Sequence, residues 1–290
     1  MDCEFSFVAL RSANFYLTTE SHRSNGWIKN MAVRHKPLKN KPLVEAILEI
    51  HWVLQTKSPG VEIDPHFKIL LGRLFDKLSS DYPEHEPLPI STFPEEMSGG
   101  VVHHRFRVGA DQWPLVQIGP GIITYNSTQD YTWDGFKPRA LSVVEKLFAA
   151  YPKRAELNVR KLVLRYIDAV EFDYGSKNVL EFLRDKMKLQ FTLPPSLFAG
   201  HQVDESPQGF SWQTAFQSTD PNGKLILRFA TGQRESKPAL VWETTFESSG
   251  NEIQKMPEDF EAWLDGAHQV VNDCFFKLIE GDLEREFTCE

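Results

Sequence analysis

The segment "PLKNKPLVEAILEIHWVL", residues 37–54, places acidic and imidazole side chains within a few residues of one another. Glu45, Glu49 and His51 could together act as a general acid, a general base or metal ligands. The even positions over 44–54 are all apolar, however, whereas these three residues occupy odd positions. A period of two is typical of a half-buried strand. The three residues are therefore candidates for a polar site, but the solvated face of a strand is the favoured interpretation.

Two further histidines are candidates for a polar site. His104 directly follows His103, and consecutive strand residues point to opposite faces, so only one of them could join His51. His268 lies at the edge of the apolar face of the last predicted helix, and Asp265 precedes it at a spacing where side chains touch. The sequence contains no HExxH spacing, no GxSxG motif and no glycine-rich loop leading into a helix. We therefore expect no catalytic residue, no cofactor and no metal.

Basic residues alternate along two predicted strands, with Arg105 and Arg107 on one and Lys161 and Arg165 on the other. Basic strand faces can carry single-stranded nucleic acid. The net charge is −8, however, and the basic residues form no cluster in the sequence, which argues against non-specific phosphate binding. The acidic residues of the first strand could instead pair with these cations across strands. Binding of RNA or DNA is therefore the alternative function.

Aromatic residues gather near predicted turns rather than on a periodic face. They are Trp113, Tyr131, Trp133 and Phe136. Tryptophan and tyrosine are frequent anchors in protein interfaces. These four residues are the candidates for contact with a protein partner, although turn aromatics more often fold back onto their own core.

The elements that position these residues follow one order twice. Each half reads as a strand, a helix, a long proline-bearing loop, three strands and a helix, without visible sequence identity between the halves. Helices segregated from runs of strands predict an α+β fold with a mainly antiparallel sheet and helices packed on one face. The pattern predicts two pseudo-repeated units, residues 37–152 and 153–290, which could form one continuous domain. Residues 1–36 are expected to be a poorly ordered extension.

Composition limits the class of protein further. The chain has 290 residues, of which 41% are apolar, and lacks an apolar run of the roughly 20 residues that a membrane-spanning helix needs. Its three cysteines are far apart and form no CxxC pair. We therefore expect reduced thiols in a cytoplasmic protein that does not interact with a membrane.

Three segments carry a resemblance to a known family: "LKNKPLVEAILEIHW", "YTWDGF" and "FEAWLDGAHQVVNDCFFKLI". Over residues 37–286 the chain resembles a sporadically distributed family of uncharacterised prokaryotic proteins of about 250–270 residues. The family has no established activity, so the resemblance implies no catalytic residue. Its patchy occurrence resembles that of genes on mobile elements, which often encode toxin–antitoxin or defence components.

The leading hypothesis is a non-enzymatic protein that works through a protein partner, in a toxin–antitoxin or phage-defence setting. The RNA- or DNA-binding module described above is the alternative. A hydrolase or metal enzyme built around His51 and His104 is the third hypothesis. The oligomeric state does not follow from the sequence.

Overall fold

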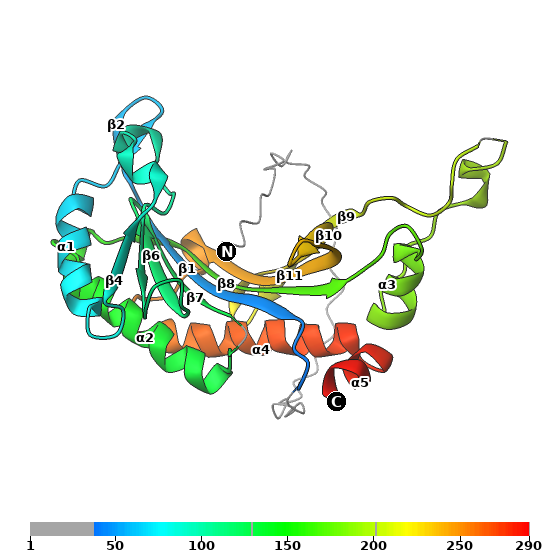
Figure 1. The fold of residues 1–290 in the computed structure, drawn as a ribbon. Helices are drawn as coiled ribbons and strands as arrows, with labels where there is room; N and C mark the ends of the chain where they lie inside the picture. Colours follow the sequence, from blue (N-terminus) through cyan, green and yellow to red (C-terminus); the bar gives the residue numbers. More distant parts are fainter. Residues whose placement is uncertain (1–37, 129, 201, 290) are drawn as a thin grey trace.

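In the computed structural model, a large antiparallel sheet runs through the whole molecule (Figure 1). The structure describes residues 38–128, 130–200 and 202–289, so the predicted extension over residues 1–36 lies outside the described residues. Nine strands form the sheet in the order β4-β5-β6-β7-β1-β8-β11-β10-β9. Every neighbouring pair is antiparallel, which confirms the predicted α+β class with an antiparallel sheet.

The strands and helices have the following bounds. The strands of the sheet are β1 (Leu43–Trp52), β4 (Glu84–Pro87), β5 (His104–Arg107), β6 (Leu115–Gly119), β7 (Ile122–Ser127), β8 (Val159–Glu171), β9 (Ser211–Thr219), β10 (Asn222–Arg234) and β11 (Lys237–Ser249). A separate hairpin consists of β2 (Gln55–Ser58) and β3 (Val61–Ile63). The helices are α1 (Phe67–Leu78), α2 (Trp133–Ala150), α3 (Val179–Met187), α4 (Phe260–Ile279) and α5 (Asp282–Thr288).

The alternation in β1 determines which face of the sheet is buried against the helices. Ala46, Leu48, Ile50 and Trp52 are almost fully buried and belong to the main core cluster. The same cluster contains the apolar side chains of α1, α2 and α4, so the even-numbered face of β1 meets helices, as the period of two predicts. Figure 1 shows α2 and α4 beneath the sheet. The odd-numbered residues of β1 therefore lie on the face of the sheet opposite α4.

The starts of two helices differ from what local residue types predict. Ser176 is a cap candidate by residue type, but Asn178 caps α3: its side-chain oxygen accepts a hydrogen bond of 2.9 Å from the Leu180 N–H. The Ser176 hydroxyl donates to Asp173 instead. Asp64 followed by Pro65 is a typical helix start and predicts a first helical residue at Pro65, but α1 begins at Phe67. The Asp64 carboxylate instead accepts from the His66 N–H, outside the helix, and from the side chains of Trp52 and Tyr151.

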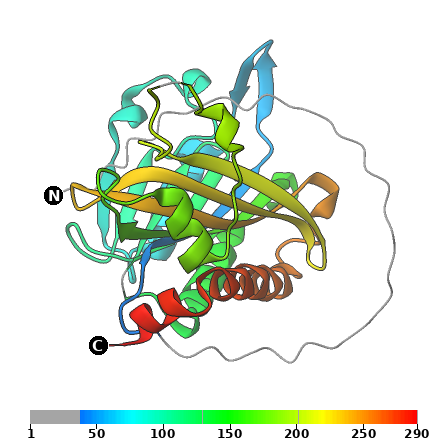
Figure 2. The ribbon, with the colours of Figure 1, turned by 90° about the vertical axis from the view of Figure 1, so that its right-hand side faces the viewer.

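Two projections rise on the side of the sheet opposite α4. We define the hairpin arm as residues 53–63 together with 88–101, which contain β2, β3, η1 (Pro89–Thr92) and η2 (Glu95–Met97). The loop arm comprises residues 189–200 and 202–209 between α3 and β9 and contains η4 (Pro195–Leu197). The hairpin arm lies at the top left of Figure 1 and the loop arm at the upper right, and both again lie at the top of Figure 2. The two arms therefore stand on either side of the sheet face opposite α4, which carries the odd-numbered residues of β1 and is called the open face below.

A membrane-crossing helix does not occur in the described part of the chain, where each helix is too short or too polar for that purpose.

Candidate partner-binding surfaces

The predicted basic residues lie on the open sheet face, where acidic residues neutralise them. On β5, Arg107 Nε lies 2.9 Å from Glu86 Oε2 of β4, and an Arg105 guanidinium nitrogen lies 3.5 Å from Glu86 Oε1. The Arg105 Nε also donates to Gln117 Oε1 of β6 at 3.0 Å. Both arginines are therefore held in cross-strand pairs, because β4, β5 and β6 are neighbours in the sheet.

The network of polar side-chain contacts continues through β7 to the two central strands, β1 and β8. The Asn126 amide donates to Glu45 at 2.8 Å, and burial raises the pKa of this glutamate despite that hydrogen bond. Glu49 accepts from the Arg165 guanidinium of β8 and lies 3.0 Å from His51. Burial lowers the pKa of His51 to about 4, and the positive charge of the nearby Lys161 is the second cause of this shift. The imidazole is therefore neutral at pH 7. Glu45, Glu49 and His51 thus contribute to one hydrogen-bonded face, but this face is not solvated as predicted, since the Glu49 and His51 side chains are only 12% and 14% exposed.

On the other half of the sheet, the same pairing reaches β10. Glu243 of β11 lies 3.2 Å from Arg228 of β10 and 3.9 Å from Arg165, and Lys161 lies 2.7 Å from Glu247. All four basic residues proposed for nucleic-acid binding are therefore ion-paired. The favoured interpretation that acids of the first strand pair across strands is confirmed for Glu49 and Arg165.

The aromatic candidates separate into two places. Tyr131 and Trp133 form one cluster with His268 of α4, since Trp133 stacks on the imidazole with ring centres 3.6 Å apart. The Tyr166 hydroxyl connects this cluster, 2.6 Å from the Tyr131 hydroxyl and 2.9 Å from His268 Nδ1. Burial lowers the pKa of His268 to about 4 and raises the pKa of Tyr166 well above its usual value.

The other two aromatic candidates differ in exposure. Phe136 is 1% exposed and packs on the buried ring of Tyr125, so it is a core residue in this structure. Trp113 is 39% exposed in the loop between β5 and β6, and no ring contact joins it to the other three candidates within the described residues. The structure therefore brings three of the four aromatic residues together, but around the α2–α4 contact rather than on an open surface.

The two adjacent histidines both lie near Phe67, with ring centres 5.5 Å (His103) and 6.2 Å (His104) from it, rather than on opposite faces of a strand, because His103 precedes β5. His104 Nδ1 lies 3.0 Å from His85 Nε2 on β4, and burial together with His85 lowers the pKa of His104 to about 4. His103 is 4% exposed and lies 3.3 Å from the Ser98 carbonyl oxygen. Across the residues that the structure describes, no group of three or more potential metal ligands occurs.

A buried acid that the sequence analysis overlooked lies in β8. Asp168 is 2% exposed, and among the residues that the structure describes its Oδ2 has no hydrogen-bond partner. Its cross-strand neighbour Trp242 and the nearby Thr244 of β11 likewise have an unpartnered Nε1 and Oγ1. Burial raises the pKa of Asp168 to about 8, although the charge of Arg234 opposes the shift. The signal was present in the sequence, because Asp168 continues the even, core-facing series of Leu162, Leu164 and Tyr166.

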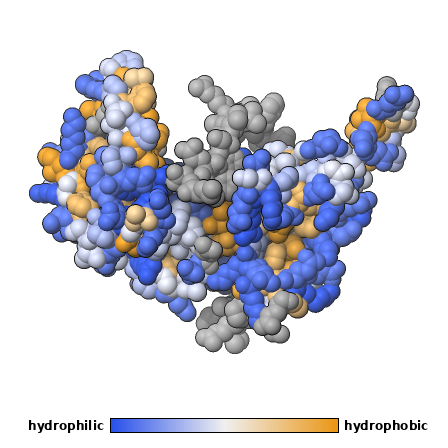
Figure 3. Space-filling model, viewed as in Figure 1, coloured by the Kyte–Doolittle hydropathy of each residue, from blue (hydrophilic) through white to orange (hydrophobic). Residues whose placement is uncertain are grey.

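The two arms carry most of the large apolar side chains that the described residues expose. Seven of the ten such side chains lie there, although the arms are small parts of the chain. They are Val53, Phe93, Met97 and Val101 on the hairpin arm and Leu193, Leu197 and Val203 on the loop arm. Figure 3 shows hydrophobic surface on both projections. Sequence reasoning missed this surface because these residues have no periodic spacing and the arms become neighbours of the open face only in three dimensions.

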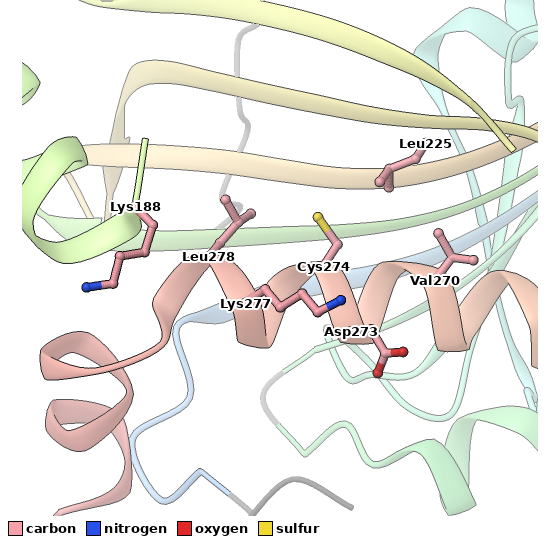
Figure 4. A pocket seen from close by; sticks show the side chains of 7 residues that line it. All are labelled: Lys188, Leu225, Val270, Asp273, Cys274, Lys277 and Leu278. Atoms are coloured by element: carbon pink, nitrogen blue, oxygen red, sulfur yellow. The ribbon is translucent and has the colours of Figure 1, made fainter. Parts of the chain in front are cut away.

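An open hollow of about 480 Å³ lies between α4 and β10 (Figure 4). Leu225, Val270 and Cys274 line its apolar part, and Lys188 and Lys277 are among its charged residues. Burial raises the pKa of the Cys274 thiol to about 11, so this thiol is protonated and unreactive near pH 7. The hollow therefore offers an apolar contact surface without a nucleophile.

Comparisons with known proteins add no relative to this picture: no family model, no curated protein and no solved structure matches the chain.

Proposed function

We propose that this chain is a non-enzymatic protein that binds a protein partner between the hairpin arm and the loop arm. The observation that carries the proposal is the concentration of exposed apolar side chains on these two projections. Isolated exposed apolar residues are common on protein surfaces, but grouped ones mark interaction sites. A partner that covers both arms would also face the polar sheet surface between them.

Met97, Leu197 and Val203 are the most exposed of the large apolar side chains on the arms, so a partner would gain most by covering them. Met97 is 75% exposed, Leu197 57% and Val203 58%. Complete burial of such a side chain contributes roughly 1.5–3 kcal/mol, so covering the exposed half or more of each contributes about 1–2 kcal/mol. The ion pairs of the open face are already satisfied within the chain, so this face would provide specificity rather than most of the affinity.

Charged substitutions on the arms test the proposal in the full-length chain. Met97→Glu and Leu197→Glu each place a carboxylate where the partner would bury an apolar side chain. The matched control is Ile69→Glu, since Ile69 is 57% exposed on α1, outside both arms. We expect quantitative cross-linking in the native host to recover one partner with the wild type and the control, and to lose it with both arm variants. A partner retained by both arm variants, or a wild type that always purifies alone, would contradict the proposal.

Nucleic-acid binding through Arg105, Arg107, Lys161 and Arg165 is the alternative proposal. The pairing of these residues with acids lowers its support, because neutralised cations release few counterions from a phosphate backbone. Salt-dependent binding of a labelled oligonucleotide that disappears in the double variant Arg105→Ala, Arg107→Ala would favour this alternative. A hydrolase or metal enzyme around His51 and His104 remains the third proposal.

A toxin–antitoxin or phage-defence setting, in the cytoplasm of a prokaryote, completes the proposal. This part rests on the resemblance of the sequence to a sporadically distributed prokaryotic family and on none of the contacts described above. A gene for the partner beside the gene for this chain would support it.

We also infer that the two halves of the chain are pseudo-equivalent units with their helices on one face. The strand order supports this inference. The first strands of the two halves, β1 and β8, are neighbours at the centre of the sheet. On each side of this pair the last strand of the half comes next, followed by the earlier ones: β7, β6 and β5 on one side, and β11, β10 and β9 on the other. In each half one helix lies in the chain between the first sheet strand and the later ones, and another follows the last strand, although the first half also contains the β2–β3 hairpin and β4. Separate expression of residues 37–152 and 153–290 would test the proposed units.

A further inference from the structure

The two edges of the sheet differ in how they are protected. At one edge, β4 has only four residues, and Glu84, Glu86 and Pro87 are three of them. Short length, charge and proline are the usual means by which an edge strand avoids pairing with another chain. The β4 edge is therefore closed to further strands.

The opposite edge, β9, has none of these features. It runs for nine residues, Ser211–Thr219, with the sequence SWQTAFQST, which contains no charged residue and no proline. Its register with β10 is regular, without a bulge from Ser211 to Thr219. Phe216 in its centre is 52% exposed. Such a strand exposes a row of backbone donors and acceptors to a pairing strand.

We propose that β9 pairs antiparallel with β9 of a second copy of this chain, so that the sheet continues across a two-fold axis at Ala215. Full-length pairing of the nine residues places Ala215 opposite Ala215 of the second copy. Gln213 then faces Gln217 of the second copy, and Phe216 faces Thr214 of the second copy. The loop arm lies beside this strand, with the Phe191 and Trp212 ring centres 5.4 Å apart, but the proposed function does not use the backbone edge of β9, so the inference goes beyond it.

The apolar side of β9 explains why a second copy fits. Trp212, Thr214 and Phe216 lie on the same face of the strand, because they are two residues apart. In the proposed register, the diagonal neighbours of Phe216 are Phe216 and Trp212 of the second copy. Diagonal neighbours across an antiparallel pair are roughly 7–8 Å apart, within reach of aromatic side chains. The strand therefore supplies its own aromatic complement, and both exposed phenylalanines become covered.

Electrostatics permit this pairing although each chain has a net charge of −8. The nearest charges on the open face of β10 are Lys224 and Arg228, which lie opposite Gln217 and Gln213 of β9. In the pair of chains, Lys224 of one copy and Arg228 of the other are three strand spacings apart, about 14 Å. This distance exceeds the Debye length of roughly 8 Å at physiological salt. The pairing therefore brings neither Lys224 nor Arg228 of one copy into contact with these cations of the other.

Charge substitutions at the two-fold axis distinguish a second copy from a foreign strand. Ala215 is exposed, so Ala215→Lys and Ala215→Glu are compatible with the fold. In the symmetric pair, each variant places two like charges on directly opposite residues, whose Cβ atoms are about 5 Å apart. An equimolar mixture of the two variants places opposite charges there instead. The matched control is Glu84→Lys, which changes an exposed residue of the β4 edge.

Sedimentation velocity of the full-length chain distinguishes monomers from dimers. A high concentration, about 100 µM, is used because the dimer fraction rises with concentration. We expect the wild type and Glu84→Lys to sediment as dimers, each Ala215 variant as a monomer, and the mixture of the two variants as a dimer. Circular dichroism should show the same secondary structure in all of them. A monomeric wild type, single variants that remain dimeric, or a mixture that remains monomeric would each overturn the proposal.

Discussion

The buried carboxyl group of Asp168 should make the stability of this protein fall as the pH rises. In the unfolded chain an aspartate has its ordinary pKa of 3.8, whereas burial raises the pKa of folded Asp168 to about 8. The folded state therefore binds the proton more tightly, and its stability is highest below pH 3.8 with respect to this group. This contribution is lost progressively as the pH rises to about 8 and stays constant above that value.

The size of the effect follows from the shift. Each pH unit between the two pKa values costs about 1.4 kcal/mol, so the full window of roughly four units corresponds to a loss on the order of 5 kcal/mol. Between pH 6.5 and pH 8 alone, the expected loss is about 2 kcal/mol. This narrower window is the informative one, because the pKa values of His51, His104 and His268 are about 4 in the folded chain. Above pH 6.5 each of those groups adds only about 0.4 kcal/mol of stability, and it does so equally in the wild type and in a variant of Asp168.

Replacing Asp168 by asparagine removes the charge and preserves the shape. Urea unfolding at pH 6.5 and at pH 8 should show that Asp168→Asn lacks the loss of about 2 kcal/mol that the wild type undergoes. The control is Asp76→Asn, at an exposed residue of α1, which should retain the wild-type pH dependence. Equal pH dependence in the wild type and in Asp168→Asn would refute the assignment of a raised pKa to this carboxyl group.

Three further substitutions or labelling experiments probe other contacts. Asp64→Ala should reduce the free energy of unfolding by about 3 kcal/mol in urea titrations, since it leaves the buried Trp52 indole N–H without its acceptor at 2.8 Å. Arg165→Met should destabilise the chain by about 2–3 kcal/mol because Glu49 loses its cation, and Glu49→Gln in the same chain should recover part of that loss in a double-mutant cycle. Cys274, whose pKa is about 11, should resist a thiol reagent at pH 8 until the chain is denatured, as site-resolved mass spectrometry can show.

Local patterns predict the elements of this fold well where their period is clear. The alternation over residues 44–54 predicts β1 and its buried face, and the structure confirms both. The helical stripe after Asp134 predicts α2, which the structure has at Trp133–Ala150. Both predictions succeed because a single face of each segment meets the core, and that face determines the period.

Short and irregular segments were beyond the reach of periodicity. The segment "KSPGVEI" resembles a turn, but in the structure it includes the end of β2 and all of β3. The proline-rich segment after Tyr82 resembles a loop, but it contains β4. Strands of three or four residues present too few side chains to show an alternation. The candidate surfaces depend on these segments and on strand order, which non-local pairing determines. The sequence predicted a strand near Ser211, for example, but not that it would form the edge of the sheet.

The central pair of strands has a consequence for synthesis of the protein. Ile47 of β1 pairs with Arg165 of β8, although about 120 residues separate them in the chain. At roughly 5–20 residues per second, a ribosome needs on the order of 6–24 seconds to add that length. During this interval β1 can pair only with β7, and its other backbone edge waits for β8. The nascent chain therefore passes through a stage in which β1, with seven apolar residues out of ten, is an unprotected sheet edge, and a chaperone would benefit it most in this period.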